Sequence, residues 1–264
     1  MPLRHELGRI SPASRAERSS GSLAGASNTR PDGSKMTLNR CSMLMASRHS
    51  GAARAAYDSR MTLLLIRHGE TALNVARVLQ PADTPLSSRG EAQAEALAKR
   101  LATMKVTAVV SSDLPRALRT AQAIAAATGA TMTTTHLLQE RNFGDWRGTP
   151  YDSMAINPLT MHEAPPGGES LADFERRVAQ AFAHVVQRQA GLGGTLAVVT
   201  HGLVIRTLLA AHVQLPAGTE QPTHLGNTSL SIVEAVPPHV ATLVNCTDHL
   251  EPTAHDDSHA LSGG

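Results

Sequence analysis

The sequence predicts an α/β fold: a three-layer α/β/α sandwich with a mostly parallel central sheet. Leu63–Ile66 and Leu196–Thr200 are short, continuous apolar runs. Such runs are typical of strands buried on both faces of a parallel sheet. Segments with helical spacing of apolar residues alternate with these runs, in the order β-α-β-α-β, then α-β-α-β-β. This alternation favours helices packed on both faces of one sheet.

Strands and helices alternate in the first half of the expected domain. The elements expected there are a strand at 63–66, a loop with a short helical piece at 72–86, a helix to about 104, a strand at 106–110, a helix through 127 and a strand at 131–135. Ser87 or Ser88 can cap the first long helix. Ser111–Asp113 is the expected cap of the second, Pro115 suits its first turn, and Gly129 ends it.

The second half contains a structured loop before its helices and strands. The elements expected there are a loop at 139–150, a short helix near 151–156, a long helix from 169 or 170 to about 189, a strand at 196–200 with a helix after it, and strands at 229–233 and 240–244. Leu171, Phe174 and Val178 lie on one side of the long helix, which is therefore amphipathic.

The composition of residues 1–60 differs from that of the remaining chain. This segment carries ten Lys or Arg against four Asp or Glu and is rich in Ser, Ala and Gly. We predict a disordered basic N-terminal extension at 1–60, a domain at 61–247 and a disordered tail at 248–264. Three accounts of the extension stay open: a start called too early with Met61 as the true start, an organelle transit segment, or a plain disordered tail.

Charge, cysteine content and hydropathy narrow the classes of partner. The extension alone carries a formal charge of +6, whereas the whole chain carries +2, so the remaining chain is mildly acidic at −4. A nucleic-acid partner is therefore not expected. Cys41 and Cys246 lie far apart and form neither a disulfide framework nor a metal-ligand spacing, so we expect a cytoplasmic location. No apolar run approaches membrane-spanning length, so no membrane partner is expected.

Two His-Gly pairs, at 68–69 and 201–202, each follow a predicted strand. The carboxyl ends of strands in open α/β sheets are where ligands bind, so the two imidazoles should lie side by side in one crevice. Gly69 would let a ligand approach the main chain closely. Arg67, which precedes His68, has a planar guanidinium suited to phosphate or carboxylate.

Two further residues support an anion site. Arg116 lies in the first turn of a predicted helix, where its charge adds to the positive field of the helix dipole, an arrangement that favours an anion between them. The alternative is an arginine that faces solvent. Glu140 begins the loop that holds the only Trp, and in a site rich in positive charge a carboxylic acid is the expected proton donor. The alternative for Glu140 is a loop residue bonded to the main chain. Clustered metal ligands are absent near His68 and His201, so we expect no metal.

Six motifs in order resemble the histidine phosphatase superfamily, branch 1, whose fold is that of phosphoglycerate mutase. They are Arg-His-Gly-Glu-Thr (67–71), Pro-Leu-Ser-Ser-Arg-Gly-Glu-Ala-Gln (85–93), Ser-Asp-Leu-Pro-Arg-Ala-Leu-Arg-Thr-Ala (112–121), Glu-Arg-Asn-Phe-Gly-Asp-Trp-Arg-Gly (140–148), Pro-Pro-Gly-Gly-Glu-Ser (165–170) and Val-Val-Thr-His-Gly (198–202). The resemblance covers about residues 61–245.

The resemblance implies a role for each matched residue. It implies a nucleophile that becomes phosphohistidine at His68, a proton donor at Glu140, a phosphoryl clamp and a further phosphate-pocket position, the last two made by Arg67, Arg116, His201 and Asn74. We also expect Gly69 and Gly202, which follow the two histidines, to bind the phosphate. It implies a small-molecule phosphate ester as the substrate, and no cofactor is expected. The sequence leaves open whether the chain forms a homodimer.

The motifs favour a phosphatase over a mutase. His201 follows Glu140 by only 61 positions, whereas the mutases have a longer insertion there. The motifs at 143–148 and 165–170 look more like those of α-ribazole phosphatase and broad-specificity phosphatases. A cofactor-dependent phosphoglycerate mutase is the alternative within enzymes. A non-catalytic phospho-ligand-binding module is the alternative from another class.

Overall fold

The computed structural model of this chain describes residues 62–250. The expected extension at 1–60, Cys41 within it, and residues 251–264 of the expected tail lie outside the described residues. The described chain continues past the domain end expected at 247, and Leu250 is only 5% exposed. Leu250 therefore packs with the domain.

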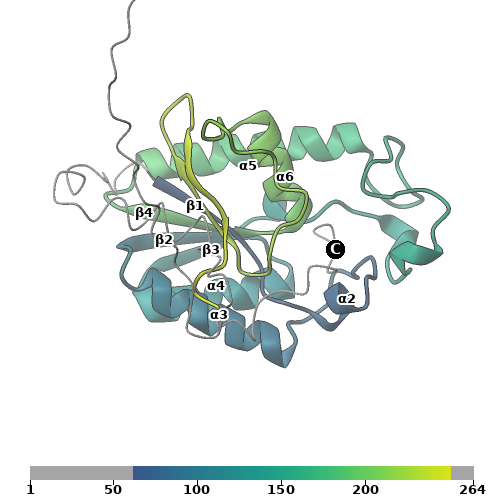
Figure 1. The fold of residues 1–264 in the computed structure, drawn as a ribbon, viewed down its shortest axis with the longest axis horizontal. Coiled ribbons are helices and arrows are strands. Elements are labelled where there is room, and N and C mark those ends of the chain that lie inside the picture. The colour runs from purple at the N-terminus through teal and green to yellow at the C-terminus, as the bar shows by residue number, and fades with distance from the viewer. Residues whose placement is uncertain (1–61, 251–264) are drawn as a thin grey trace, which may run out of the picture. The chain divides into compact units, whose positions relative to one another are not determined.

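The centre of the fold is a six-stranded sheet with the strand order β3-β2-β4-β1-β5-β6 (Figure 1). Its strands are β1 (Thr62–Arg67), β2 (Val106–Ser111), β3 (Thr131–Thr134), β4 (Thr195–Thr200), β5 (Leu230–Glu234) and β6 (Ala241–Cys246). The four strands from β3 to β1 are parallel, and β5 and β6 add an antiparallel edge. The expectation of a mostly parallel sheet is confirmed.

Helices cover both faces of this sheet. They are α2 (Ala72–Val75), α3 (Ser88–Leu101), α4 (Pro115–Thr128), α5 (Leu171–Ala190) and α6 (Gly202–Ala211), with short 3-10 helices η2 (His136–Leu138), η3 (Gly144–Trp146) and η4 (Tyr151–Ser153). Alternate residues of β1 point to opposite faces. Leu63 and Leu65 pack in the core under α5 and α6, while Leu64 and Ile66 pack under α3 and α4. These two cores make the expected three-layer sandwich.

Local signals placed most helix ends correctly. Ser87 caps α3, Ser170 caps α5, and Gly129 ends α4 with a positive φ of 69°. Two expectations were wrong. α3 ends at Leu101, three residues before the expected end, and the residue at the N-cap of α4 is Leu114, without a side-chain cap. Ser112, one of the three residues expected to cap α4, makes a contact with His201 that is described below.

None of the helices among residues 62–250 is long and apolar enough to cross a membrane.

Candidate active site

The register of three parallel strands brings the two His-Gly pairs together. Arg67 of β1 pairs with Thr200 of β4, so the residues that follow, His68 and His201, leave the sheet next to each other. The His68 main-chain N–H donates to Thr200 O at 3.0 Å. Ser112 follows β2, and its main-chain N–H donates to Val199 O at 2.9 Å. The carboxyl ends of three neighbouring strands therefore bring polar side chains together.

Both imidazoles are fully buried, with ring centroids 5.1 Å apart and ring planes tilted by 59°. His68 Nδ1 lies 2.7 Å from Gly69 O. A carbonyl oxygen can only accept, so this contact places the proton of the neutral ring on Nδ1 and leaves a lone pair on Nε2. The predicted juxtaposition of the two rings is confirmed.

His201 is held in a different way from His68. Its Nε2 lies 2.9 Å from Ser112 Oγ, while its buried Nδ1 has no hydrogen-bond partner within residues 62–250. Burial, followed by the charges of Arg116, His68 and Arg67, lowers the pKa of His201 well below the ordinary value of 6.5. His201 is therefore neutral at neutral pH.

Arg67 and Arg116 are 0% and 1% exposed. Arg67 Nη1 donates to Leu225 O, and Arg116 Nη1 donates to Pro81 O at 3.3 Å. Burial lowers the pKa of Arg116 to about 10, helped by the charges of Arg147 and Arg67 and opposed by Glu140. The position of Arg116 in the first turn of α4 is confirmed, and the solvent-facing alternative is wrong.

Asn74 is connected to His68 by hydrogen bonds, and Gly69 and Gly202 each follow a histidine in the chain. Asn74 is 2% exposed and forms a capping box with Thr71 at the start of α2. Asn227 Nδ2 donates to Asn74 Oδ1 at 3.3 Å and to His68 O at 3.2 Å, which connects Asn74 to the main chain of His68. Gly202 is the first residue of α6, directly after His201.

Packing inside the domain gives Gly69 a reason to be glycine that differs from the expected one. A Cβ at this position would lie 2.6 Å from Gly90 O in the first turn of α3. The Gly69 N–H also donates to Thr120 Oγ1 at 3.1 Å. The close approach at Gly69 is therefore to the main chain of α3.

The side chain of Glu140 contacts the N-terminus of α6, and this residue is 5% exposed. Its Oε2 accepts from the Leu203 N–H at 3.0 Å, and its Oε1 accepts from the Arg141 N–H at 2.9 Å. Burial raises the pKa of this carboxyl, although both N–H donors and the charges of Arg116 and Arg177 lower it. The protonated form is therefore favoured more than in an exposed glutamate.

The sequence analysis did not assign several residues that adjoin this site. These are Ser112, Tyr151, Arg147, Arg177 and Asn227. Ser112 was expected as a helix cap, but its hydroxyl contacts His201. The Tyr151 hydroxyl is buried near Glu140, and burial raises its pKa. Ser112 and Arg147 lie inside the quoted motifs, which is the one signal that pointed to them.

The part of the chain that the structure describes contains no group of three or more His, Cys, Asp or Glu side chains that could hold a metal ion. The groups gathered around the two histidines are cationic or neutral, with Glu140 as the acid. Such a donor set suits an anion such as phosphate.

Comparison with known proteins agrees with this chemistry. The family model of the histidine phosphatase superfamily (branch 1) matches residues 63–246. The chain belongs to the histidine phosphatase superfamily, branch 1.

Named relatives within this superfamily include both a mutase and phosphatases. The chain is 36% identical over 184 residues to a probable phosphoglycerate mutase GpmB of Yersinia pestis, covering 66% of this chain and 85% of the relative. A mycobacterial glucosyl-3-phosphoglycerate phosphatase complexed with VO3 is 32% identical, with a TM-score of 0.57 and coverage of 66% and 91%. A phosphoserine phosphatase variant of Entamoeba histolytica in complex with phosphoserine is 26% identical, with a TM-score of 0.57 and coverage of 72% and 99%.

Members of the histidine phosphatase superfamily include phosphatases and mutases, and the two buried histidines of this chain lie at the carboxyl ends of neighbouring parallel strands. Of the residues that the sequence analysis selected, the structure brings His68, His201, Arg67, Arg116 and Glu140 into one electrostatic cluster. Asn74 is connected to it through Asn227.

Proposed function

We propose that this chain is a metal-independent phosphomonoester hydrolase that acts on a small phosphorylated metabolite through a phosphohistidine at His68. The observation that carries the proposal is the pair of buried imidazoles with two buried arginines, Arg67 and Arg116, beside them. Guanidinium groups form strong, charge-assisted hydrogen bonds to phosphate oxygens. A dianionic phosphoryl group is therefore the kind of ligand that this pair of arginines favours.

In the first half-reaction, His68 Nε2 uses its lone pair to form a bond to phosphorus. The contact of Nδ1 with Gly69 O keeps that lone pair on Nε2. The bond between phosphorus and the ester oxygen breaks, and the leaving oxygen takes a proton from Glu140. The raised pKa of the Glu140 carboxyl supports its protonation before this step.

Arg67, Arg116 and His201 stabilise the negative charge that spreads over the phosphoryl oxygens. Phosphoryl transfer depends mainly on positioning and charge stabilisation. Ser112 Oγ accepts from the Leu114 N–H at 3.3 Å, so its hydroxyl proton can be donated to His201 Nε2. A neutral His201 then carries its proton on Nδ1, the nitrogen that is able to donate to a phosphoryl oxygen.

In the second half-reaction, the Glu140 carboxylate takes a proton from water, and the water oxygen forms a bond to phosphorus. The bond between phosphorus and His68 Nε2 breaks, which releases inorganic phosphate and restores the neutral imidazole. The same carboxyl thus acts as acid and then as base. No step in this cycle requires a metal, because Arg67 and Arg116 provide the positive charge.

A phosphoglycerate mutase is the second candidate, since a relative at 36% identity carries that name. Two observations support hydrolysis instead. The span between Glu140 and His201 is 61 residues, and two of the reported relatives are named phosphatases. Phosphoglycerate and phosphoserine, which those names contain, are both monoesters of small acids. A panel of such esters would separate phosphate release from isomerisation.

The deciding experiment combines this panel with rapid quenching. We expect an acid-labile, alkali-stable phosphoprotein in the wild type and none in His68→Ala, together with release of inorganic phosphate. Unimpaired turnover by His68→Ala would contradict the role of His68. Interconversion of 2- and 3-phosphoglycerate without phosphate release would favour the mutase, and binding without any turnover would favour the non-catalytic module.

A further inference from the structure

Arg177 of α5 forms a partly buried ion pair with Glu169 and also contacts the main chain of Glu140. Arg177 Nε donates to Glu169 Oε1 at 2.9 Å, and Nη2 donates to Oε2 at 2.8 Å. The two side chains are 16% and 15% exposed. A bidentate pair of this kind fixes the orientation of the guanidinium plane.

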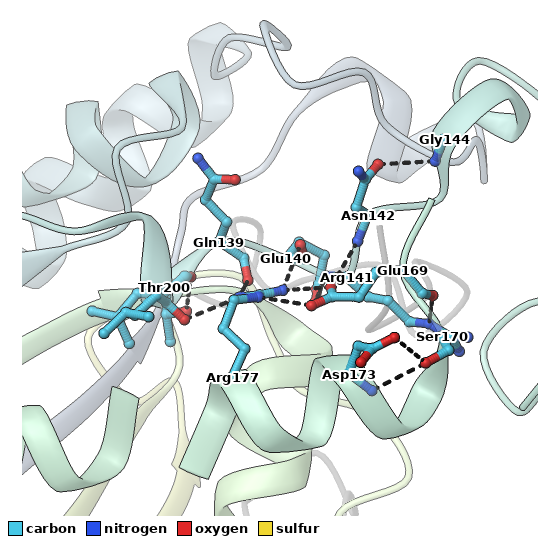
Figure 2. A network of polar contacts seen from close by, with 12 residues as sticks. Gln139, Glu140, Arg141, Asn142, Gly144, Glu169, Ser170, Asp173, Arg177 and Thr200 are labelled. Atoms are coloured by element: carbon cyan, nitrogen blue, oxygen red, sulfur yellow. Dashed lines mark hydrogen bonds and ion pairs between the residues drawn. The ribbon is translucent and has the colours of Figure 1, made fainter. Parts of the chain in front are cut away.

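The remaining donors of Arg177 bind the main chain that carries Glu140. Nη1 donates to Leu137 O at 2.9 Å and to Gln139 O at 2.7 Å, and Nη2 donates to Glu140 O at 3.3 Å. All five N–H donors of the guanidinium therefore have an acceptor. Figure 2 shows the Arg177 side chain reaching from its helix toward Gln139, Glu140 and Glu169.

Residues 139–143, which include Glu140, belong to no helix or strand, so side-chain contacts such as these hold their main chain. On the C-terminal side of Glu140, the main chain is held by the Glu169 N–H, which donates to Asn142 O at 2.8 Å. The side chain of Arg141 donates to Glu169 O at 3.2 Å and to Met161 O at 2.8 Å. The start of α5 and the residues before it thus hold the main chain on both sides of Glu140.

We propose that Arg177 is a positioning residue for the proton donor Glu140: oriented by Glu169, it holds residues 137–140 so that the Glu140 carboxyl reaches the N-terminus of α6. This inference rests on the proposed function. Arg177 binds the main chain of Glu140 and not its carboxyl, so it acts through Glu140. The Glu140 carboxyl spans two N–H donors, from Leu203 and Arg141, at 3.0 and 2.9 Å. A displacement of about 1 Å would break this arrangement, and misplacement of that size can cost on the order of 100-fold in rate.

Leaving-group dependence distinguishes positioning of an acid from a purely structural role. The full chain would be compared as wild type, Arg177→Met, Arg177→Lys and Glu169→Gln. The control is Arg176→Met, which removes the neighbouring arginine of α5, an exposed residue paired with Asp173. For each protein, the burst rates of phosphoenzyme formation from glycerol phosphate and from p-nitrophenyl phosphate would be measured, together with the melting temperature.

We expect the ratio of the alkyl to the aryl burst rate to fall by roughly 10- to 100-fold in Arg177→Met. Arg177→Lys keeps the charge but not the planar fork, and Glu169→Gln loses the anion that orients the fork, so both should lower the ratio by a smaller factor. Arg176→Met should keep the wild-type ratio. A merely structural role would lower the melting temperature and both rates together, and would leave the ratio unchanged.

An unchanged ratio in folded Arg177→Lys and Glu169→Gln would overturn the inference, and these two variants decide it if Arg177→Met does not fold. A wild type that turns over neither ester would overturn the proposed function and this inference with it. A wild type that is active, with variants that keep its ratio, would overturn this inference alone.

Discussion

Glu140→Gln tests whether Glu140 donates a proton to the leaving oxygen. The change keeps the size of the side chain but removes the transferable proton. A positioned general acid contributes about 10²–10⁴ in rate. This corresponds to roughly 2.7–5.5 kcal/mol of activation free energy. An alkyl alcohol is a poor leaving group and needs this proton, whereas p-nitrophenolate leaves readily without it.

The structure also predicts a cost in stability for Glu140→Gln. Both carboxyl oxygens of Glu140 accept a main-chain N–H, at 2.9 and 3.0 Å. An amide offers one oxygen, so its NH₂ group would face one of the two donors. A buried donor left unpaired costs about 1–3 kcal/mol of unfolding free energy. For a domain of this size each kcal/mol lowers the melting temperature by about 2–4 °C. Rates must therefore be measured well below the melting temperature of the variant.

The assay is the burst phase of phosphoenzyme formation by quenched flow, because the same carboxyl also serves the second half-reaction and steady-state rates would mix the two effects. We expect a burst rate on glycerol phosphate that is lower by about 10²–10⁴, with a clearly smaller loss on p-nitrophenyl phosphate. Asp145→Asn, a change to an exposed acid of the same loop, is the control. Equal losses on both esters would show that Glu140 binds phosphate and does not donate a proton.

Three further predictions follow from the site and the sequence. Treatment with a chelator should leave phosphatase activity unchanged, because arginines supply the positive charge, and a large loss restored by Mg²⁺ would contradict this. The unfolding free energy of the wild type should fall as pH drops below 6.5, since the unfolded chain protonates His201 whereas the folded chain keeps it neutral. The contribution is about 1.4 kcal/mol per pH unit, so unfolding curves of the wild type and His201→Asn that stay parallel in pH would refute it. A chain that begins at Met61 should match the full chain in activity and melting temperature, and a clear destabilisation would refute the prediction that residues 1–60 are dispensable.

Local signals were sufficient for most of the fold. Apolar runs such as Leu63–Ile66 predicted buried strands because a strand covered on both faces has no polar side to alternate with. The hydroxyl group at Ser87 predicted a helix start because it satisfies a main-chain N–H within a few residues. The cap expected at Ser111–Asp113 was wrong because Leu114 occupies the N-cap of α4 and makes no side-chain cap. The Ser112 hydroxyl contacts both the Leu114 N–H and a residue that follows a distant strand. That residue, His201, lies 89 residues further along the chain.

The sequence by itself determined the α/β class, the identity of the family and the residues at its matched positions, because these depend on short segments whose composition and order are visible in one dimension. The two His-Gly pairs led us to expect both histidines in one crevice, but only the tertiary structure decided the sheet order and the register of β1 and β4 that bring them together, with Arg67 paired to Thr200. It also decided that Arg177 holds the main chain of Glu140. The physical reason is that hydrogen bonds between residues far apart in the chain form only once sheet order and helix packing have set the distances between them.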